Sequence, residues 1–199
     1  MADKVFSLGD IKPITLADGT VINARIIGFN HDHNDIGQIN PITFETVETM
    51  NEDSPMNSEC TNEGGWGKST LRSALNGHFF DTMLPEDLRA VIKPTAKLTG
   101  TGGRTPKMGK TIDKLFVLSE QEIFGRKIYS IGEEGRWYDW YKQENNPYWK
   151  SKQNGERDWR WERSPRGGDT NGFCSVDSGG HASYGGASTS CGVSFGFCV

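Results

Sequence analysis

The sequence predicts an α+β fold in which small antiparallel sheets and two central helices are joined by long loops. Three observations lead to this fold class. Near the start of the chain, two apolar segments flank Asp18-Gly19, a dipeptide that favours the tight turn of a β-hairpin. The middle contains two short segments with helical periodicity and capping residues. In residues 159–199, apolar residues alternate with small or polar ones between Gly-rich loops, as in half-buried strands.

The first part of the chain is expected to be rich in β-structure. The turn at Asp18-Gly19 predicts strands at residues 14–16 and 21–27. Residues 29–35 are dense in Asn, Asp and His, which suit either a turn or a metal ion, and the turn is favoured because the sequence shows no second group of ligands. Residues 43–60 are acidic, polar and poorly periodic, so we expect an exposed connection there.

Two helices are expected in the centre of the chain. The first begins at Ser69 or Thr70, either of which can cap its N-terminus, and ends at Gly77. The residues expected on its buried face are Leu71, Ala74 and Leu75. The second begins near Pro85 and stops before Pro94. Its expected inward residues are Leu88, Val91 and Ile92.

The segment that follows is expected to mix loop and buried structure. Residues 99–110 read as a loop of Gly, Thr and Lys that lacks the Gly-Lys-Ser/Thr signature of a phosphate-binding loop. Residues 114–118 are predicted to form a buried strand because four of the five are apolar. Ser119 and Glu122 have the spacing of a capping box that opens a helical turn.

Aromatic residues are concentrated between residues 137 and 161, where five of the six tryptophans lie. Such rings could stack on a carbohydrate, but tryptophan also packs loops and satisfies backbone carbonyls through its indole N–H, and we favour this packing interpretation. Arg157, Arg160 and Arg163 are expected to stack on rings and to donate hydrogen bonds to carbonyls. Cys60, Cys174, Cys191 and Cys198 lack Cys-x-x-Cys spacing, and the last three are expected to be free thiols buried on strands.

Composition limits the classes of partner. A chain of 199 residues with 34% hydrophobic and 24% charged residues is expected to form a single domain over residues 1–199. We divide it into a β-rich part (1–63), a helix and strand scaffold (64–135) and an aromatic segment with a tail (136–199). The net charge of −4 disfavours nucleic acid as a partner. Neither membrane insertion nor a signal peptide is expected, because no run approaches the about 20 apolar residues of a membrane span and the start of the chain lacks an apolar core.

Four stretches of the sequence together resemble one protein family. They are GGWGKSTLRSALNGHFFDTMLP, EDLRAVIKP, DKLFVLSEQEIFG and a C-terminal W-x-RSP…FCSVDSGGHAS…GVSFGFCV. This combination, from about Gly64 onward, resembles the variable proteins of diversity-generating retroelements, which include phage tail-tip receptor-binding proteins and have a C-type-lectin-like fold. The resemblance implies a lectin-like scaffold that displays randomised side chains on a fixed backbone. The chain departs from the family pattern at Glu162, where an aliphatic residue is common, and at Ser194-Phe195, where the family often has Arg-Pro.

The composition of the tail fits such randomisation. Residues 163–199 contain no Lys, Glu, Gln, Met or Trp. All amino acids that do occur there have codons ending in a pyrimidine, which is the set reached when Asn codons are randomised at their adenines. Low-complexity bias is the alternative source of such a pattern.

The candidate site is a ligand-binding surface in this tail. Strand alternation places Cys174, Val176 and Ala182 inward, so that their neighbours face outward and can vary without changing the core. The predicted surface consists of Arg166, Gly168, Asp169, Thr170, Ser175, Asp177, His181, Ser183, Tyr184 and Gly185. Tyr184 is its one large aromatic residue and is expected to anchor the ligand, as tyrosines do in antibody paratopes.

The function expected from this surface is recognition of a protein or glycan receptor on a target cell, by a chain carried on a phage virion or on a bacterial surface. A homotrimer or display on a larger assembly is the expected state. No catalytic residue, metal ligand or cofactor is predicted. Two alternatives stay open: a fixed-specificity lectin, of which the calcium-dependent type is disfavoured because Glu144-Asn145-Asn146-Pro147 is not its ligand motif, and a formylglycine-generating-like oxidase that would use Cys191 and Cys198.

Overall fold

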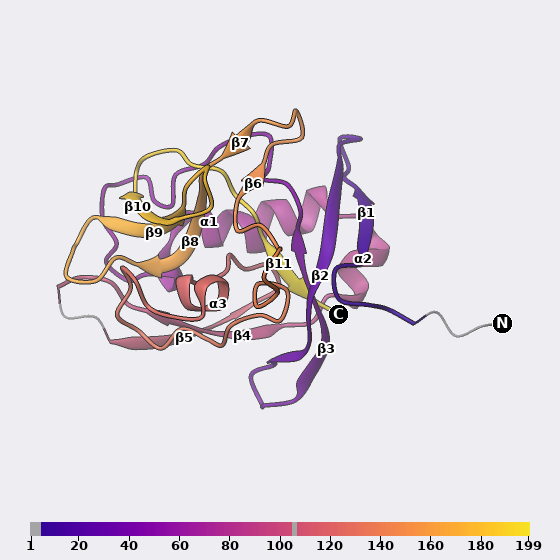
Figure 1. Cartoon of the computed structure of the whole chain (residues 1–199), viewed down its shortest axis with the longest axis horizontal. Coiled ribbons are helices and arrows are strands. Elements are labelled where there is room, and N and C mark those ends of the chain that lie inside the picture. The colour runs from indigo at the N-terminus through magenta and orange to yellow at the C-terminus, as the bar shows by residue number, and fades with distance from the viewer. Residues whose placement is uncertain (1–4, 105–106) are drawn as a thin grey trace.

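The protein has a mixed α/β fold, seen in a computed structural model that describes residues 5–104 and 107–199 (Figure 1). Small antiparallel sheets and a few short helices are joined by long loops, which confirms the predicted combination of elements. The strands are β1 Ile11–Thr15, β2 Val21–His33, β3 Ile39–Thr46, β4 Thr95–Gly100, β5 Met108–Asp113, β6 Lys150–Ser151, β7 Arg157–Asp158, β8 Arg160–Pro165, β9 Gly172–Val176, β10 Ala182–Gly186 and β11 Gly196–Cys198. The helical segments are η1 Trp66–Lys68, α1 Thr70–Ala74, η2 Leu75–Met83, α2 Glu86–Val91 and α3 Glu120–Phe124. Within the described residues, no helix combines the length and the hydrophobicity needed to cross a membrane.

The first sheet has the strand order β1-β2-β3-β11 and contains the predicted hairpin. Its turn is held by a hydrogen bond of 2.8 Å from the Thr20 N–H to the Asp18 carboxylate, and Gly19 has a φ of 86° that favours glycine. The prediction of a turn at residues 29–35 is wrong for the most part, because β2 continues to His33 and the chain reverses only after it. The exposed connection predicted at 43–60 is also wrong, since it begins inside β3, whose last four residues are buried.

The end of the chain completes this first sheet. Strand β11 pairs antiparallel with β3, and the rings of Phe197 and Phe44 stack with their centroids 5.2 Å apart. Phe116 and Gly196 form an isolated antiparallel β-bridge, in which the backbone N–H of each residue donates to the carbonyl of the other. In the segment predicted as a buried strand at 114–118, the four apolar residues are buried as expected and Lys114 is exposed, but the described structure has this isolated bridge in place of a strand. In Figure 1 this sheet lies at the right, and the sheet formed by β8, β9 and β10 lies at the upper left.

The two central helices form where they are predicted, with different ends. The Ser69 hydroxyl caps α1 by accepting a hydrogen bond of 3.1 Å from the Arg72 N–H. Gly77 kinks the helical chain without ending it, because η2 runs on to Met83. Two residues expected inward face solvent instead: Ala74 is exposed, and Val91 is 51% exposed.

Two further predictions, a capping box at Ser119 and a loop at residues 99–110, have different outcomes. The capping box is confirmed, because the Ser119 hydroxyl accepts from the Glu122 N–H and the Glu122 carboxylate accepts from the Ser119 N–H, both at 3.1 Å. The loop predicted at residues 99–110 is wrong at both of its ends. It contains the end of β4 and the start of β5, which pair as a hairpin, and the residues numbered 105–106 lie outside the described part.

A buried ionic network connects the sheets. Lys97 in β4 donates to Asp32 at 2.6 Å, to Glu122 at 3.1 Å and to the hydroxyl of Tyr138 at 2.7 Å, and Arg163 donates to Glu122 at 2.5 Å. The charged groups of this network form hydrogen bonds and ion pairs with one another. Buried charges are tolerated in a protein core when they are paired in this way. The network explains why the polar residues of the segment 29–35 do not form a surface turn.

The three arginines behave as predicted. Arg157 lies over the ring of Trp149 at 4.3 Å, while Arg160 and Arg163 are buried and donate to carbonyls. The acceptors are the carbonyls of Tyr148 for Arg160 and of Leu98, Val117 and Glu134 for Arg163. Leu98 lies in β4, but the carbonyls of Tyr148, Val117 and Glu134 lie outside the strands, so the two arginines fix three segments of loop.

Candidate ligand-binding surface

The predicted surface residues fall at three levels of exposure. Gly168, His181 and Tyr184 are exposed, and Ser175 is buried with only 1% exposure. The half-buried residues are Arg166, Asp169, Thr170, Asp177, Ser183 and Gly185. The outward orientation predicted for Ser175 is wrong because β9 is the central strand of its sheet and is covered on both faces.

One part of the surface is an aromatic and basic patch, which we call the Tyr184 patch: Tyr129, Arg166, Asp169 and Tyr184. The Arg166 guanidinium lies 3.6 Å from the centroid of the Tyr184 ring, and the Tyr129 ring meets the same ring edge-on at 5.0 Å. Arg166 also forms an ion pair of 3.0 Å with Asp169. Although Arg166 and Tyr129 both contact the Tyr184 ring, Tyr184 is still 41% exposed, so part of the residue's surface is accessible to a ligand.

The backbone under this patch is held by Asn62, which sequence reasoning missed. Its side-chain amide donates to the carbonyls of Asp169 at 3.1 Å and Gly172 at 2.8 Å, and its backbone N–H donates to the carbonyl of Thr170 at 2.8 Å. The Asn62 side-chain oxygen accepts from the Gly103 N–H at 2.8 Å. All of these contacts use backbone groups of the loop, so they do not depend on which side chains the loop carries.

A second missed element is the loop that contains Tyr129. The Tyr129 carbonyl accepts from the Gly167 N–H at 2.8 Å, and an added Cβ on Gly167 would collide with Ile131. Tyr129 and Ile131 are 36% and 55% exposed. Both lie more than thirty residues before Arg166 in the sequence, and their only local signal was the apolar-polar alternation in Ile128-Tyr129-Ser130-Ile131.

The turn between β9 and β10 forms the other part of the surface. The Asp177 carboxylate accepts from the N–H groups of Gly179 at 2.8 Å and His181 at 2.9 Å. Partial burial acts to raise the pKa of Asp177, but these donors outweigh it and lower the pKa. Asp169 has a similar role, because it accepts from the Asn171 N–H at 2.8 Å. Both aspartates therefore support their own turns as well as facing solvent.

Two glycines of the predicted surface are limited in what can replace them. Gly168 has a φ of 72°, which disfavours most side chains. An added Cβ on Gly185 would lie 3.2 Å from the Trp161 ring, so Gly185 faces the core rather than a ligand. In the remaining exposed or half-buried positions of the predicted surface, Arg166, Thr170, His181, Ser183 and Tyr184, the side chains hold no backbone group in the described residues.

The aromatic segment favours packing over a sugar platform, as predicted. Trp161 and Trp137 donate their indole N–H groups to the carbonyls of Ser54 and Ile123, each at 2.8 Å. Trp161 is 1% exposed, whereas Trp159 is 46% exposed. A single exposed indole does not form the row of rings that a sugar-binding platform needs.

The remaining candidate groups also have defined surroundings. His31 stacks on Tyr138 with ring centroids 4.0 Å apart, and burial lowers its pKa. Cys174, Cys191 and Cys198 are buried free thiols, as expected, while Cys60 is exposed. Burial raises the pKa of Cys191 and of Cys198 to about 12, so each thiol keeps its proton near neutral pH.

The chain matches one family of known proteins. Residues 40–199 match a family described as a domain of unknown function (DUF6273). No curated protein and no solved structure matches the chain.

Proposed function

Since the match spans residues 40–199, the chain belongs to the DUF6273 family, and we propose that this member is a receptor-binding display protein. Its scaffold is fixed, and the Tyr184 patch together with the β9–β10 turn presents a surface whose side chains can be exchanged. The chain is a variable protein of a diversity-generating retroelement, and its target is a protein or glycan on a cell surface.

The proposal includes a C-type-lectin-like fold. Three features support it: the last strand pairs beside the first strands, two short helices lie in the middle of the chain, and a separate small sheet carries the tail. In such an arrangement the two ends of the chain share one sheet, and the tail between them is free to carry long loops.

One observation carries the functional proposal. The loop at 166–172 is anchored to the rest of the chain through its own backbone, by Asn62 and by the Tyr129 carbonyl, and the loop side chain that holds its backbone is that of Asp169. Exchange of the outward side chains therefore leaves the anchors in place. A binding surface can change under this condition while the fold does not.

Two alternatives are less well supported. An oxidase that uses Cys191 and Cys198 would need a reactive thiolate, and burial raises the pKa of both thiols. A calcium-dependent lectin would need its ligand motif, and Glu144-Asn145-Asn146-Pro147 is not that motif.

The experiment compares two libraries of the whole chain displayed on yeast. The first randomises the free surface positions Arg166, Thr170, His181, Ser183 and Tyr184. The second randomises the buried positions Phe173, Cys174, Val176, Phe195 and Phe197. We expect most clones of the first library, and few of the second, to resist protease as well as the parent chain does.

Selection of the first library against a purified protein such as lysozyme should then yield folded binders. Binding should be lost when the selected residue at position 184 is changed to Ala. The display proposal fails if both libraries lose protease resistance equally often, or if the folded clones contain no binder.

A further inference from the structure

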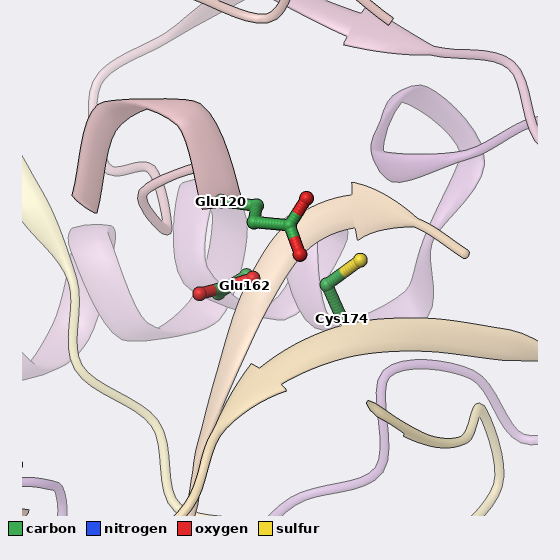
Figure 2. Close-up of side chains that lie close together, drawn as sticks. All are labelled: Glu120, Glu162 and Cys174. Atoms are coloured by element: carbon green, nitrogen blue, oxygen red, sulfur yellow. The ribbon is translucent and has the colours of Figure 1, made fainter. Parts of the chain in front are cut away.

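A buried group of possible metal ligands lies outside the binding surface. Glu120 in α3, Glu162 in β8 and Cys174 in β9 are all buried, and one ligand atom from each lies within 4.8 Å of the others. Figure 2 shows their side chains converging from these three elements. Neither the resemblance nor the proposed function assigns a role to this group.

Glu162 gives the independent sign that something is bound here. Its side chain is fully buried, and neither carboxylate oxygen has a hydrogen-bond partner among the described residues. Arg160 pairs through its Nη1 with Glu45 at 3.3 Å and Arg163 pairs with Glu122 at 2.5 Å, and the Arg160 Nε, like the Glu162 oxygens, has no hydrogen-bond partner among the described residues. A buried carboxyl group without a partner is costly, so an occupant that satisfies it would stabilise the fold.

Glu120 is held in a fixed orientation by its other contacts. It accepts from the N–H groups of Ile128 at 2.7 Å, Tyr129 at 2.8 Å and Ser130 at 2.9 Å, and from the Ser130 hydroxyl at 2.8 Å. Only the Tyr129 bond reaches Oε1, which leaves a lone pair on that oxygen. Hydrogen bonds of this kind orient the carboxylate ligands of metal ions.

A bulge in the sheet brings Cys174 and Glu162 together. Strands β8 and β9 pair at Trp161–Ser175 and again at Pro165–Phe173 with a shifted register between these pairs, and Glu162 and Cys174 lie in this irregular stretch. On the next strand Tyr184 pairs directly with Cys174. The cluster therefore lies beneath the Tyr184 patch.

We propose that Glu120, Glu162 and Cys174 form a site for one divalent transition-metal ion of the zinc class. Two carboxylate oxygens and one thiolate suit zinc, whereas calcium and magnesium take oxygen ligands only. Binding displaces the protons of the Glu162 carboxyl and the Cys174 thiol into solvent and forms one metal–oxygen and one metal–sulfur bond in their place. Three protein ligands leave a fourth position for water.

The test uses the full chain with Cys60 changed to Ser, because Cys60 is the exposed thiol. After removal of metal with EDTA, one equivalent of Co²⁺ should produce the near-ultraviolet charge-transfer band of a cobalt–thiolate bond, and Zn²⁺ should remove it. Cys174→Ser should abolish the band. The matched control Cys191→Ser, which changes another buried thiol, should keep it.

Stability provides a second measurement that does not depend on the thiol. Zn²⁺ should raise the melting temperature of the Cys60→Ser parent relative to EDTA. Glu162→Leu removes the unpartnered carboxyl group, so it should melt higher than the parent in EDTA and show no response to Zn²⁺. Ser130→Ala, which loosens Glu120, should weaken the affinity for cobalt by about 10-fold.

The proposal is overturned if the parent shows neither a cobalt band nor a melting shift with Zn²⁺, which is the result expected for a site occupied by water. It is also overturned if the band persists in Cys174→Ser, or if Glu162→Leu keeps the response to Zn²⁺.

Discussion

Asp32 shows at the scale of one residue how a polar segment becomes part of the core. Its carboxylate accepts from Lys97 at 2.6 Å and from the Tyr138 hydroxyl at 2.7 Å. Burial alone would raise the pKa of Asp32, but the ammonium group of Lys97 outweighs this effect and holds the pKa far below its usual value. The folded chain therefore holds this carboxylate ionised over a pH range in which the unfolded chain binds a proton.

The sign of the pH dependence follows from this lowered pKa. Stability from Asp32 is fully present above its unfolded pKa of about 3.9 and is lost as the pH falls below it. Asp32→Asn should cost about 3–5 kcal/mol at neutral pH, because Lys97 loses a buried partner. Urea melts between about pH 3 and about pH 7 measure the free energy of unfolding. As the pH falls, this free energy should decrease less steeply in the variant than in the parent. Parallel curves for the two chains would contradict the assignment.

Ser175 and Trp161 test the correction made to the tail. Trp161→Ala should lower the free energy of unfolding by about 3–5 kcal/mol, since the indole is buried and hydrogen-bonded. Ser175→Ala should change it by less than about 1 kcal/mol and not destabilise the chain, because the buried hydroxyl has no partner to lose. Denaturant melts of both variants measure this, and a large loss at Ser175 would mean that its hydroxyl is bonded.

At this scale the sequence predicted part of the candidate site. Composition and alternation were enough to find Tyr184 and Arg166, since both follow from the tail itself. Asn62 and Tyr129 could not be found in the same way, because each contacts the tail from a segment far away in the sequence. Ser175 was misplaced because alternation indicates two faces of a strand but not whether both are covered.

At the scale of elements, the loop at 166–172 depends on one side chain. Asn62→Ala removes two hydrogen bonds to loop carbonyls and one from Gly103, all at a buried position. We expect a loss of about 2–4 kcal/mol in the free energy of unfolding and faster hydrogen exchange at residues 166–172. Asn154→Ala is the matched control, because Asn154 is exposed and bonds only Glu156. Equal exchange rates in the two variants would refute the anchoring role.

Elements stabilised by neighbours in the sequence were predictable, and elements stabilised by distant partners were not. The Asp18-Gly19 hairpin and the capping box at Ser119 carry their own hydrogen bonds. By contrast, β3 reads as polar because Glu45 is matched by Arg160 and Lys150 from distant parts of the chain. No local pattern contains those partners, so a buried charged strand resembles an exposed loop.

At the scale of the molecule, binding strength should come from several copies. The Tyr184 patch and the β9–β10 turn together contain fewer residues than the about 20–30 per side of a standard interface, so one chain should bind modestly. Fusion to a trimeric scaffold should raise the apparent affinity for target bacterial cells by about 10²-fold or more. Tyr184→Ala should abolish this gain with little change in melting temperature. If the variant chain Trp137→Ala loses binding while Tyr184→Ala keeps it, the site belongs to the aromatic segment.

The position of β11 also has a consequence for synthesis on the ribosome. Strands β1, β2 and β3 leave the ribosome first, but the edge of β3 finds its partner only when residues 196–198 emerge. The exchangeable residues at 166–184 are translated inside that interval. The sheet β1-β2-β3-β11 can therefore be completed only after residues 166–184 have been synthesised. A variant tail that cannot fold leaves an open strand edge, which is the kind of surface that chaperones and proteases recognise.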